Sequence, residues 1–188
     1  MNKNHYALIF ILFGIALLLA GFSSSETEQS VAQSSPPTNT QPVSATKEEN
    51  SARQIDFALK DMNDQFRHIS EWNGKILVLN FWATWCGPCR HEIPAFNDIQ
   101  KKYAQHNVQF IGLAYDDKAA IERFTRVIPI DYPVLYGDDE VMELSMKYGN
   151  IQSILPYTLF VDPQGKVFHI TEGALTQEAT ERILAKVL

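Results

Sequence analysis

The most constraining feature of this sequence is an apolar run at Ile76–Trp82 that is followed, after only a few residues, by a helical pattern. The run is rich in β-branched and aromatic side chains, which is typical of a strand buried on both faces of a sheet. Residues 86–103 then carry apolar side chains at helical spacing, and residues 108–115 form the next expected strand. A strand, a helix and a strand in this order predict a right-handed crossover between parallel strands.

The remaining pattern predicts one α/β domain over residues 54–188, a normal size for a single domain. Ile55, Phe57 and Leu59 alternate with polar residues, which predicts an edge strand, and a turn with a short second strand follows within residues 61–73. Further helices are expected at residues 117–127, at 138–148 and after Thr176, and further strands at 132–136, 157–161 and 167–171. Asp162-Pro163-Gln164-Gly165 is a turn sequence that makes the last two strands antiparallel. We therefore expect a mixed central sheet flanked by helices, with an N-terminal β extension.

Residues 1–22 are expected to lie outside this domain. Lys3 precedes a run without charged residues that extends over residues 6–22. The run is longer than the core of most signal peptides and shorter than most spanning helices. A cleaved signal peptide and a retained N-terminal membrane anchor both stay open, and Phe22 stands where a lipoprotein would need a cysteine. In either case Lys3 stays on the cytoplasmic side, which predicts that the domain lies outside, at the extracytoplasmic face of the membrane or in the periplasm.

Two cysteines, Cys86 and Cys89, are the strongest chemical signal in the sequence. Alone they make neither a disulfide framework nor a four-ligand zinc site. The expected strand delivers Cys86 to the start of a helix, where free N–H groups and the helix dipole favour a thiolate. Cys89 follows one turn later and can attack a mixed disulfide formed by Cys86. This spacing predicts thiol–disulfide exchange without a metal or another cofactor.

The sequence around the cysteines resembles a known family. Trp85-Cys86-Gly87-Pro88-Cys89 resembles the active site of the thioredoxin superfamily. Residues 79–90, Glu92-Ile93-Pro94 and residues 155–162 resemble its TlpA/ResA-like branch of membrane-tethered or periplasmic thiol–disulfide oxidoreductases. The resemblance implies a thioredoxin-like fold and an enzyme that reduces protein disulfides. It also implies a membrane thiol-reducing partner as electron donor, because an oxidising compartment does not supply the electrons.

The resemblance further implies roles for single residues. Pro156 matches the family's cis-proline, which docks substrate backbone together with Leu155 opposite the cysteines; a trans proline opening a strand is the alternative. Glu92 matches an acid that assists proton transfer, although a carboxylate in a first helical turn also complements the helix dipole. Trp85 matches an aromatic residue of the docking surface, to which Gly87 and Pro88 also belong, and a core position is its alternative.

One departure from cytoplasmic thioredoxins is informative. Asn80 stands where they carry a buried Asp, and an amide cannot accept a proton in that role. Proton acceptance must therefore fall to Glu92 or to water.

Asp116 and Asp117 are interpreted as charges at the start of the following helix rather than as a metal site.

Two other functions stay open on the same fold. A peroxiredoxin-type peroxidase is one, although such enzymes place their reactive cysteine in a Thr-x-x-Cys context that this chain lacks. A copper-binding assembly factor is the other, although its cysteines are usually spaced by three residues. Nucleic acid is an unlikely partner, because the net charge is −6 and no basic stripe is present.

Residues 23–52 give a first prediction. They are rich in Ser, Thr, Gln, Glu and Pro and have almost no large apolar side chains, so they are expected to form a disordered linker. Deleting residues 24–52 from a soluble form of the protein should leave its melting temperature unchanged within experimental error. A clear loss of thermal stability would mean that the segment packs on the domain.

Overall fold

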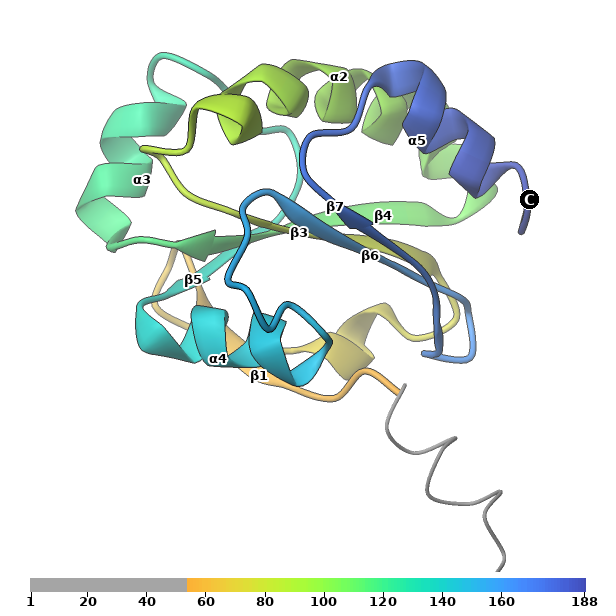
Figure 1. Ribbon diagram of the computed structural model, residues 1–188, viewed down its shortest axis with the longest axis horizontal. Helices are drawn as coiled ribbons and strands as arrows, with labels where there is room; N and C mark the ends of the chain where they lie inside the picture. The colour runs from red at the N-terminus through yellow and green to blue at the C-terminus, as the bar shows by residue number, and fades with distance from the viewer. Residues whose placement is uncertain (1–53) are drawn as a thin grey trace, which may run out of the picture. The chain divides into compact units, whose positions relative to one another are not determined.

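The structure is a computed structural model that describes residues 54–188, and it contains one mixed, seven-stranded sheet (Figure 1). The strands are β1 (Ala58–Asp61), β2 (Phe66–His68), β3 (Ile76–Trp82), β4 (Val108–Tyr115), β5 (Val134–Gly137), β6 (Tyr157–Val161) and β7 (Val167–Glu172). Their order across the sheet is β2-β1-β5-β4-β3-β6-β7. The helices are η1 (Ile69–Trp72), α2 (Gly87–Tyr103), η2 (Ala104–His106), α3 (Lys118–Thr125), α4 (Asp139–Lys147) and α5 (Gln177–Leu184).

The centre of the sheet is the predicted crossover. β3 and β4 pair in parallel along the whole of β3, from Ile76 opposite Val108 to Trp82 opposite Ala114. β5 extends this parallel set beside β4, whereas β6 and β7 are antiparallel. Every residue of β3 is buried. The predictions of a mixed sheet and of a central strand buried on both faces are therefore confirmed.

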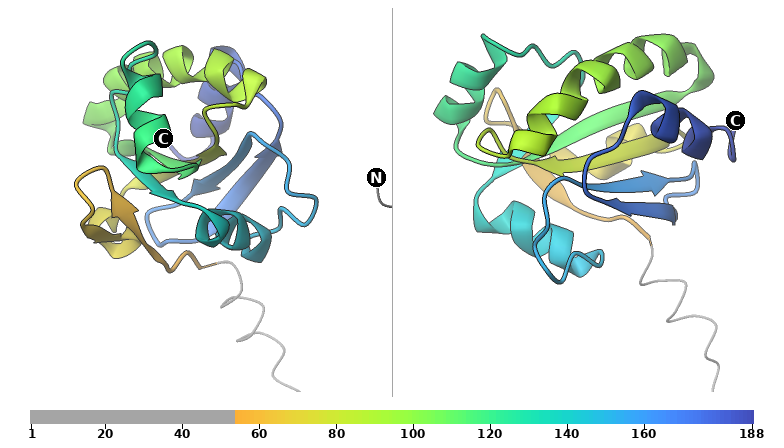
Figure 2. Two further views of the ribbon diagram at one scale, coloured as in Figure 1. Left: turned by 90° about the vertical axis from the view of Figure 1, so that its left-hand side faces the viewer. Right: turned by 45° about the horizontal axis from the view of Figure 1, so that its top comes forward.

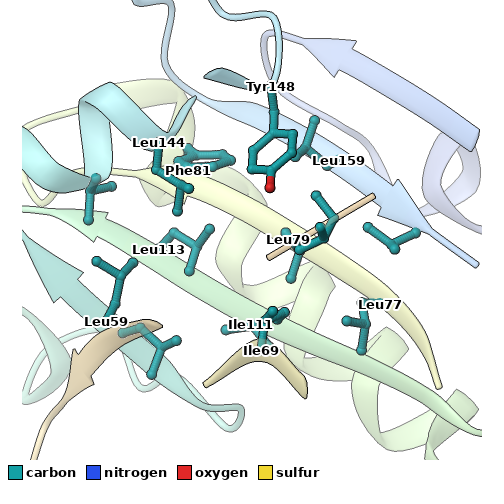
Figure 3. Packing of buried hydrophobic residues seen from close by; sticks show 14 of the residues in the cluster. Leu59, Ile69, Leu77, Leu79, Phe81, Ile111, Leu113, Leu144, Tyr148 and Leu159 are labelled. Atoms are coloured by element: carbon teal, nitrogen blue, oxygen red, sulfur yellow. The ribbon is translucent and has the colours of Figure 1, made fainter. Parts of the chain in front are cut away.

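The helices cover both faces of the sheet. Helices α2, α3 and α5 lie on one face and α4 on the other (Figures 1 and 2). Because side chains alternate along a strand, β3 contributes to both layers. Leu77, Leu79 and Phe81 enter the core cluster on the α4 side, where Leu144 and Tyr148 pack against them (Figure 3). Ile76 and Val78 enter the cluster beneath α2 and α5, which includes Phe96, Ile99, Phe110, Phe160 and Leu184.

The predicted N-terminal β extension is present, but one detail of the prediction is wrong. β1 is not an edge strand: it lies between β2 and β5, with Lys60 opposite Tyr136. The hairpin turn between β1 and β2 is attached to the rest of the domain through Asp64, which accepts hydrogen bonds from Tyr136 and Lys118. The alternation of apolar and polar residues indicated a half-buried strand. Such a pattern carries no information on which other strands pair with β1.

The predicted element boundaries are confirmed to within a few residues, because the signals that set them are local. Asp117 and Thr176 cap α3 and α5, and each side chain accepts a hydrogen bond from a backbone N–H three residues later. Gly149, with a φ of 109°, ends α4. A Cβ at this glycine would lie 2.9 Å from the hydroxyl of buried Tyr157, so the position has no room for a side chain.

The expected leader and linker, residues 1–22 and 23–52, lie outside the described residues. Within residues 54–188, no helix combines the length and the apolar character needed to cross a membrane.

Candidate active site

The two cysteines lie where β3 passes into α2. They form a disulfide with an S–S distance of 2.03 Å and a Cα–Cα distance of 5.3 Å. Cys86 is the N-cap residue of α2, and its sulfur accepts a hydrogen bond of 3.3 Å from the backbone N–H of Cys89. Cys86 retains 5% of its surface, whereas Cys89 is fully buried. Of the two cysteines, the one at the helix start therefore keeps the greater exposure, and its sulfur has a stabilising N–H group beside it.

The loop that carries Cys86 is held by the neighbouring strand. The carboxylate of Asp116, just beyond β4, accepts hydrogen bonds from the backbone N–H of Thr84 at 2.8 Å and from its hydroxyl at 2.7 Å. The expectation that Asp116 serves the start of the next helix is wrong; Asp117 alone caps α3. An acidic residue at the carboxyl end of the parallel neighbour is a signal that could have found this contact, since those strand ends meet at one edge.

Both cysteines belong to a buried apolar cluster with Trp82, Ile93 and Ile121. Trp85 does not: its side chain is 64% exposed and packs edge-on against Tyr115, with ring centroids 6.3 Å apart. The alternative that Trp85 is a core residue is therefore wrong. Gly87 and Pro88, in the first turn of α2, are also exposed.

Glu92 is the most unusual group near the cysteines. It is 2% exposed and lies in the second turn of α2, so its assignment to the first helical turn is wrong. One carboxylate oxygen accepts a hydrogen bond of 2.8 Å from the side-chain amide of Asn80, and the other accepts one of 3.0 Å from the backbone N–H of Leu175. The same Asn80 amide nitrogen donates to the hydroxyl of Thr158 at 3.1 Å. β3 and the segment before α5 thus contact this carboxylate directly, and β6 is linked to it through Asn80.

Burial raises the pKa of Glu92 from its usual 4.5 to about 7, against the lowering effect of the Leu175 and Asn80 hydrogen bonds. Since this carboxyl lies one helical turn beyond Cys89, it is suited to exchange a proton near neutral pH. The roles of Thr158 and of the Leu175 N–H were missed in the sequence, because both lie more than 60 residues from Glu92 and no local pattern marks them.

Pro156 comes to the same region through the pairing of β3 with β6. Phe81 lies opposite Tyr157, so Pro156 lies beside the end of β3 that leads into the cysteine loop. The Leu155–Pro156 peptide bond is cis, as the resemblance implied, and the trans alternative is wrong. Leu155 is half-buried and packs against the cluster that contains both cysteines. The predicted site residues of α2 and of the loop before β6 are thus gathered at one end of the sheet.

Among residues 54–188, no group of three or more His, Cys, Asp or Glu side chains is arranged to hold a metal ion.

Known proteins are similar to this chain in sequence and in structure. The profile of the AhpC/TSA family matches residues 51–170. The thiol-disulfide oxidoreductase ResA of Bacillus thuringiensis subsp. konkukian is 33% identical over 132 residues, which cover 70% of this chain and 74% of that protein. A crystal structure assigned as the thiol:disulfide interchange protein DsbE of Chlorobium tepidum has 28% identity and a TM-score of 0.65, covering 72% of this chain and 96% of that one. The structure of MTB dsbF in its mixed oxidised and reduced forms has 27% identity and a TM-score of 0.62. The match covers 73% of this chain and 98% of that one. The chain therefore belongs to the AhpC/TSA family, and it is a thiol–disulfide oxidoreductase with a thioredoxin-like fold.

Proposed function

We propose that this protein reduces protein disulfides outside the cytoplasm, with Cys86 as the attacking sulfur and Cys89 as the resolving one. The observation that carries the assignment is the asymmetry of the pair. The Cys86 sulfur sits at a helix N-cap beside the Cys89 N–H, and Cys86 keeps 5% of its surface exposed, while Cys89 is fully buried. A thiolate is favoured at the first position and disfavoured at the second.

The reaction then proceeds in two exchanges. The Cys86 thiolate attacks one sulfur of the substrate disulfide, the substrate S–S bond breaks, and the leaving thiolate takes up a proton from solvent. Cys89 loses its proton and attacks the Cys86 sulfur of the mixed disulfide, which releases the second substrate thiolate. Two electrons pass to the substrate, and the protein is left with the Cys86–Cys89 disulfide seen in the structure.

Glu92 is the proposed proton acceptor for Cys89. Its carboxyl is buried one helical turn away, and a pKa of about 7 leaves a useful fraction ionised at neutral pH. Asn80 cannot replace it as a base, but its amide stabilises the ionised form by donating a hydrogen bond. The proton passes directly or through a water molecule, as the buried thiol requires help to ionise.

The docking surface for the substrate chain is assigned to residues around the cysteines. Trp85 offers an exposed aromatic face, and Gly87 and Pro88 leave the helix start uncovered by large side chains. Leu155 and Pro156 border the same loop from the β6 side. These residues surround Cys86 without contributing titratable groups, which suits the binding of an extended polypeptide.

The place of action is inferred from the N-terminal sequence. Lys3 and the uncharged run of residues 6–22 fit a signal peptide or a membrane anchor that directs the domain outward. A reductase in an oxidising compartment must be re-reduced after each turnover. We therefore assign a membrane thiol-reducing protein as the electron donor, and membrane contact to the N-terminal segment alone.

The order of attack predicts different behaviour of the two single-cysteine variants. Cys89→Ser should be alkylated rapidly at neutral pH and should accumulate mixed disulfides with insulin, because its reactive sulfur is retained. Cys86→Ser should do neither. Alkylation rates followed by mass spectrometry test this, and equal rates in the two variants would contradict the assignment.

Turnover of hydrogen peroxide without a protein disulfide would favour the peroxidase alternative instead.

Removal of the Glu92 carboxylate should slow insulin-disulfide reduction by about 10²-fold or more near neutral pH, as is typical when a general base is lost. The rate of the parent should rise with pH through about 7, as Glu92 loses its proton, and Glu92→Gln should lack this rise. The apparent pKa of Cys86 should fall in the variant, because a nearby negative charge is gone. Asp98→Asn, an exposed change in the same helix, is the control. Equal rates for Glu92→Gln and the parent across about pH 5 to 9 would assign the proton to solvent.

The raised pKa of Glu92 also predicts how stability depends on pH. Between pH 4.5 and about 7 the unfolded chain loses this proton while the folded chain keeps it, so the folded state loses stability as pH rises. The loss is on the order of 3 kcal/mol by about pH 8, since one pKa unit corresponds to about 1.4 kcal/mol. Glu92→Gln should escape this loss. Urea unfolding of the oxidised proteins measures the difference, and parallel pH dependences in parent and variant would refute it.

A further inference from the structure

A cleft of about 290 Å³ opens beside the cysteines, between the beginning of α2 and helix α3. The two helices lie next to each other on the same face of the sheet (Figures 1 and 2). The cleft is lined by Thr84 from the cysteine loop, by Arg90 from α2, and by Arg123, Phe124 and Val127 from α3 and the turn that follows. Thr84 precedes Cys86 by two residues and Arg90 directly follows Cys89, so the cleft borders the loop and the helix turn that carry the cysteines.

The charge of this cleft is opposite to that of the whole protein. The chain has a net charge of −6, yet both charged residues of the lining are arginines. Within residues 54–188, neither Arg90 nor Arg123 forms an ion pair. The Arg90 guanidinium lies 6.0 Å from the centre of the Phe124 ring. This cation–π contact positions the guanidinium but leaves its positive charge unneutralised.

Three acidic residues lie close to the cleft residues in the sequence. Asp116 accepts two hydrogen bonds from Thr84, and Asp117 caps α3. Glu122 lies one helical turn after Lys118, on the face that Lys118 directs towards Asp64. None of the three lines the cleft, so its two guanidinium groups are left to bind an external anion.

The floor of the cleft is apolar. Phe124 packs against Trp82, with ring centroids 5.0 Å apart, and against the cluster that holds both cysteines. Val127 is 78% exposed at the rim. A partner that fits this surface therefore carries an apolar side chain together with a carboxylate.

We propose that this cleft binds an acidic, partly apolar segment next to the reactive cysteine of a protein disulfide substrate. The inference deepens the proposed function, since it rests on attack by Cys86. When the substrate cysteine is bonded to Cys86, extended residues a few positions away reach the cleft, because each residue spans about 3.3 Å. The planar guanidinium groups of Arg90 and Arg123 suit bidentate binding of a carboxylate. Charges at the rim of an interface mainly raise the association rate and exclude partners of the wrong charge.

Three disulfide-bonded peptides test the proposal with the reduced full-length protein. They have one length and one apolar residue in common and differ only near the cysteine, where they carry Asp, Asn or Lys. Rates of reduction should fall in the order Asp, Asn, Lys, with about three- to tenfold between neighbours at low salt and less at high salt. Equal rates for the three peptides would overturn the inference and leave the proposed function standing. No reduction of any peptide would overturn both.

A charge reversal makes the test specific to the cleft. Arg123→Glu should reverse the order of the Asp and Lys peptides, each rate being taken relative to that of the Asn peptide in the same variant, because the charge of the cleft is reversed. Lys166→Glu is the matched control: it changes the net charge equally, but it lies in the turn at the other end of β6 from Pro156. The same preference in Arg123→Glu as in the parent would overturn the proposal, as would an equal reversal in Lys166→Glu.

Discussion

The pairing of β3 on both of its edges decides where the functional groups of this protein lie. β4 runs parallel to β3 on one side, and its end places Asp116 where it can hold the cysteine loop. β6 runs antiparallel on the other side and brings Thr158 opposite Asn80. Because both neighbours are in register with one fully buried strand, the sheet determines where Asp116, Asn80 and Thr158 lie relative to one another.

The buried carboxylate of Glu92 is the main electrostatic cost within this arrangement. An ionised group without water is unfavourable, and the two hydrogen bonds from Asn80 and Leu175 offset only part of that cost. An aspartate at position 80 would place a second carboxylate against the first, whereas an amide donates to it. The asparagine and the glutamate therefore make sense as a pair: one residue carries the proton and the other adjusts how readily it is lost.

The proposed substrate-binding surface combines two kinds of recognition. Around Cys86, the exposed face of Trp85 and the uncovered helix start offer contacts that any extended chain can use. Towards α3, Arg90 over Phe124 and Arg123 in the same cleft carry the charge to which we attribute discrimination between such chains. In this proposal, contacts to any substrate chain and discrimination by charge come from different elements. The charged residues of the cleft can therefore vary without disturbing the thiol chemistry.

The sequence by itself determined the central strand, the helix that follows it and the position of Cys86 at the helix start. These rest on signals within about 20 residues, namely apolar periodicity, capping residues and turn residues. Only the tertiary structure decided that Glu92 is buried, that Trp85 is exposed and that β1 lies inside the sheet. The physical reason is that burial and pairing depend on partners distant in the chain, such as Leu175, which lies 83 residues from Glu92.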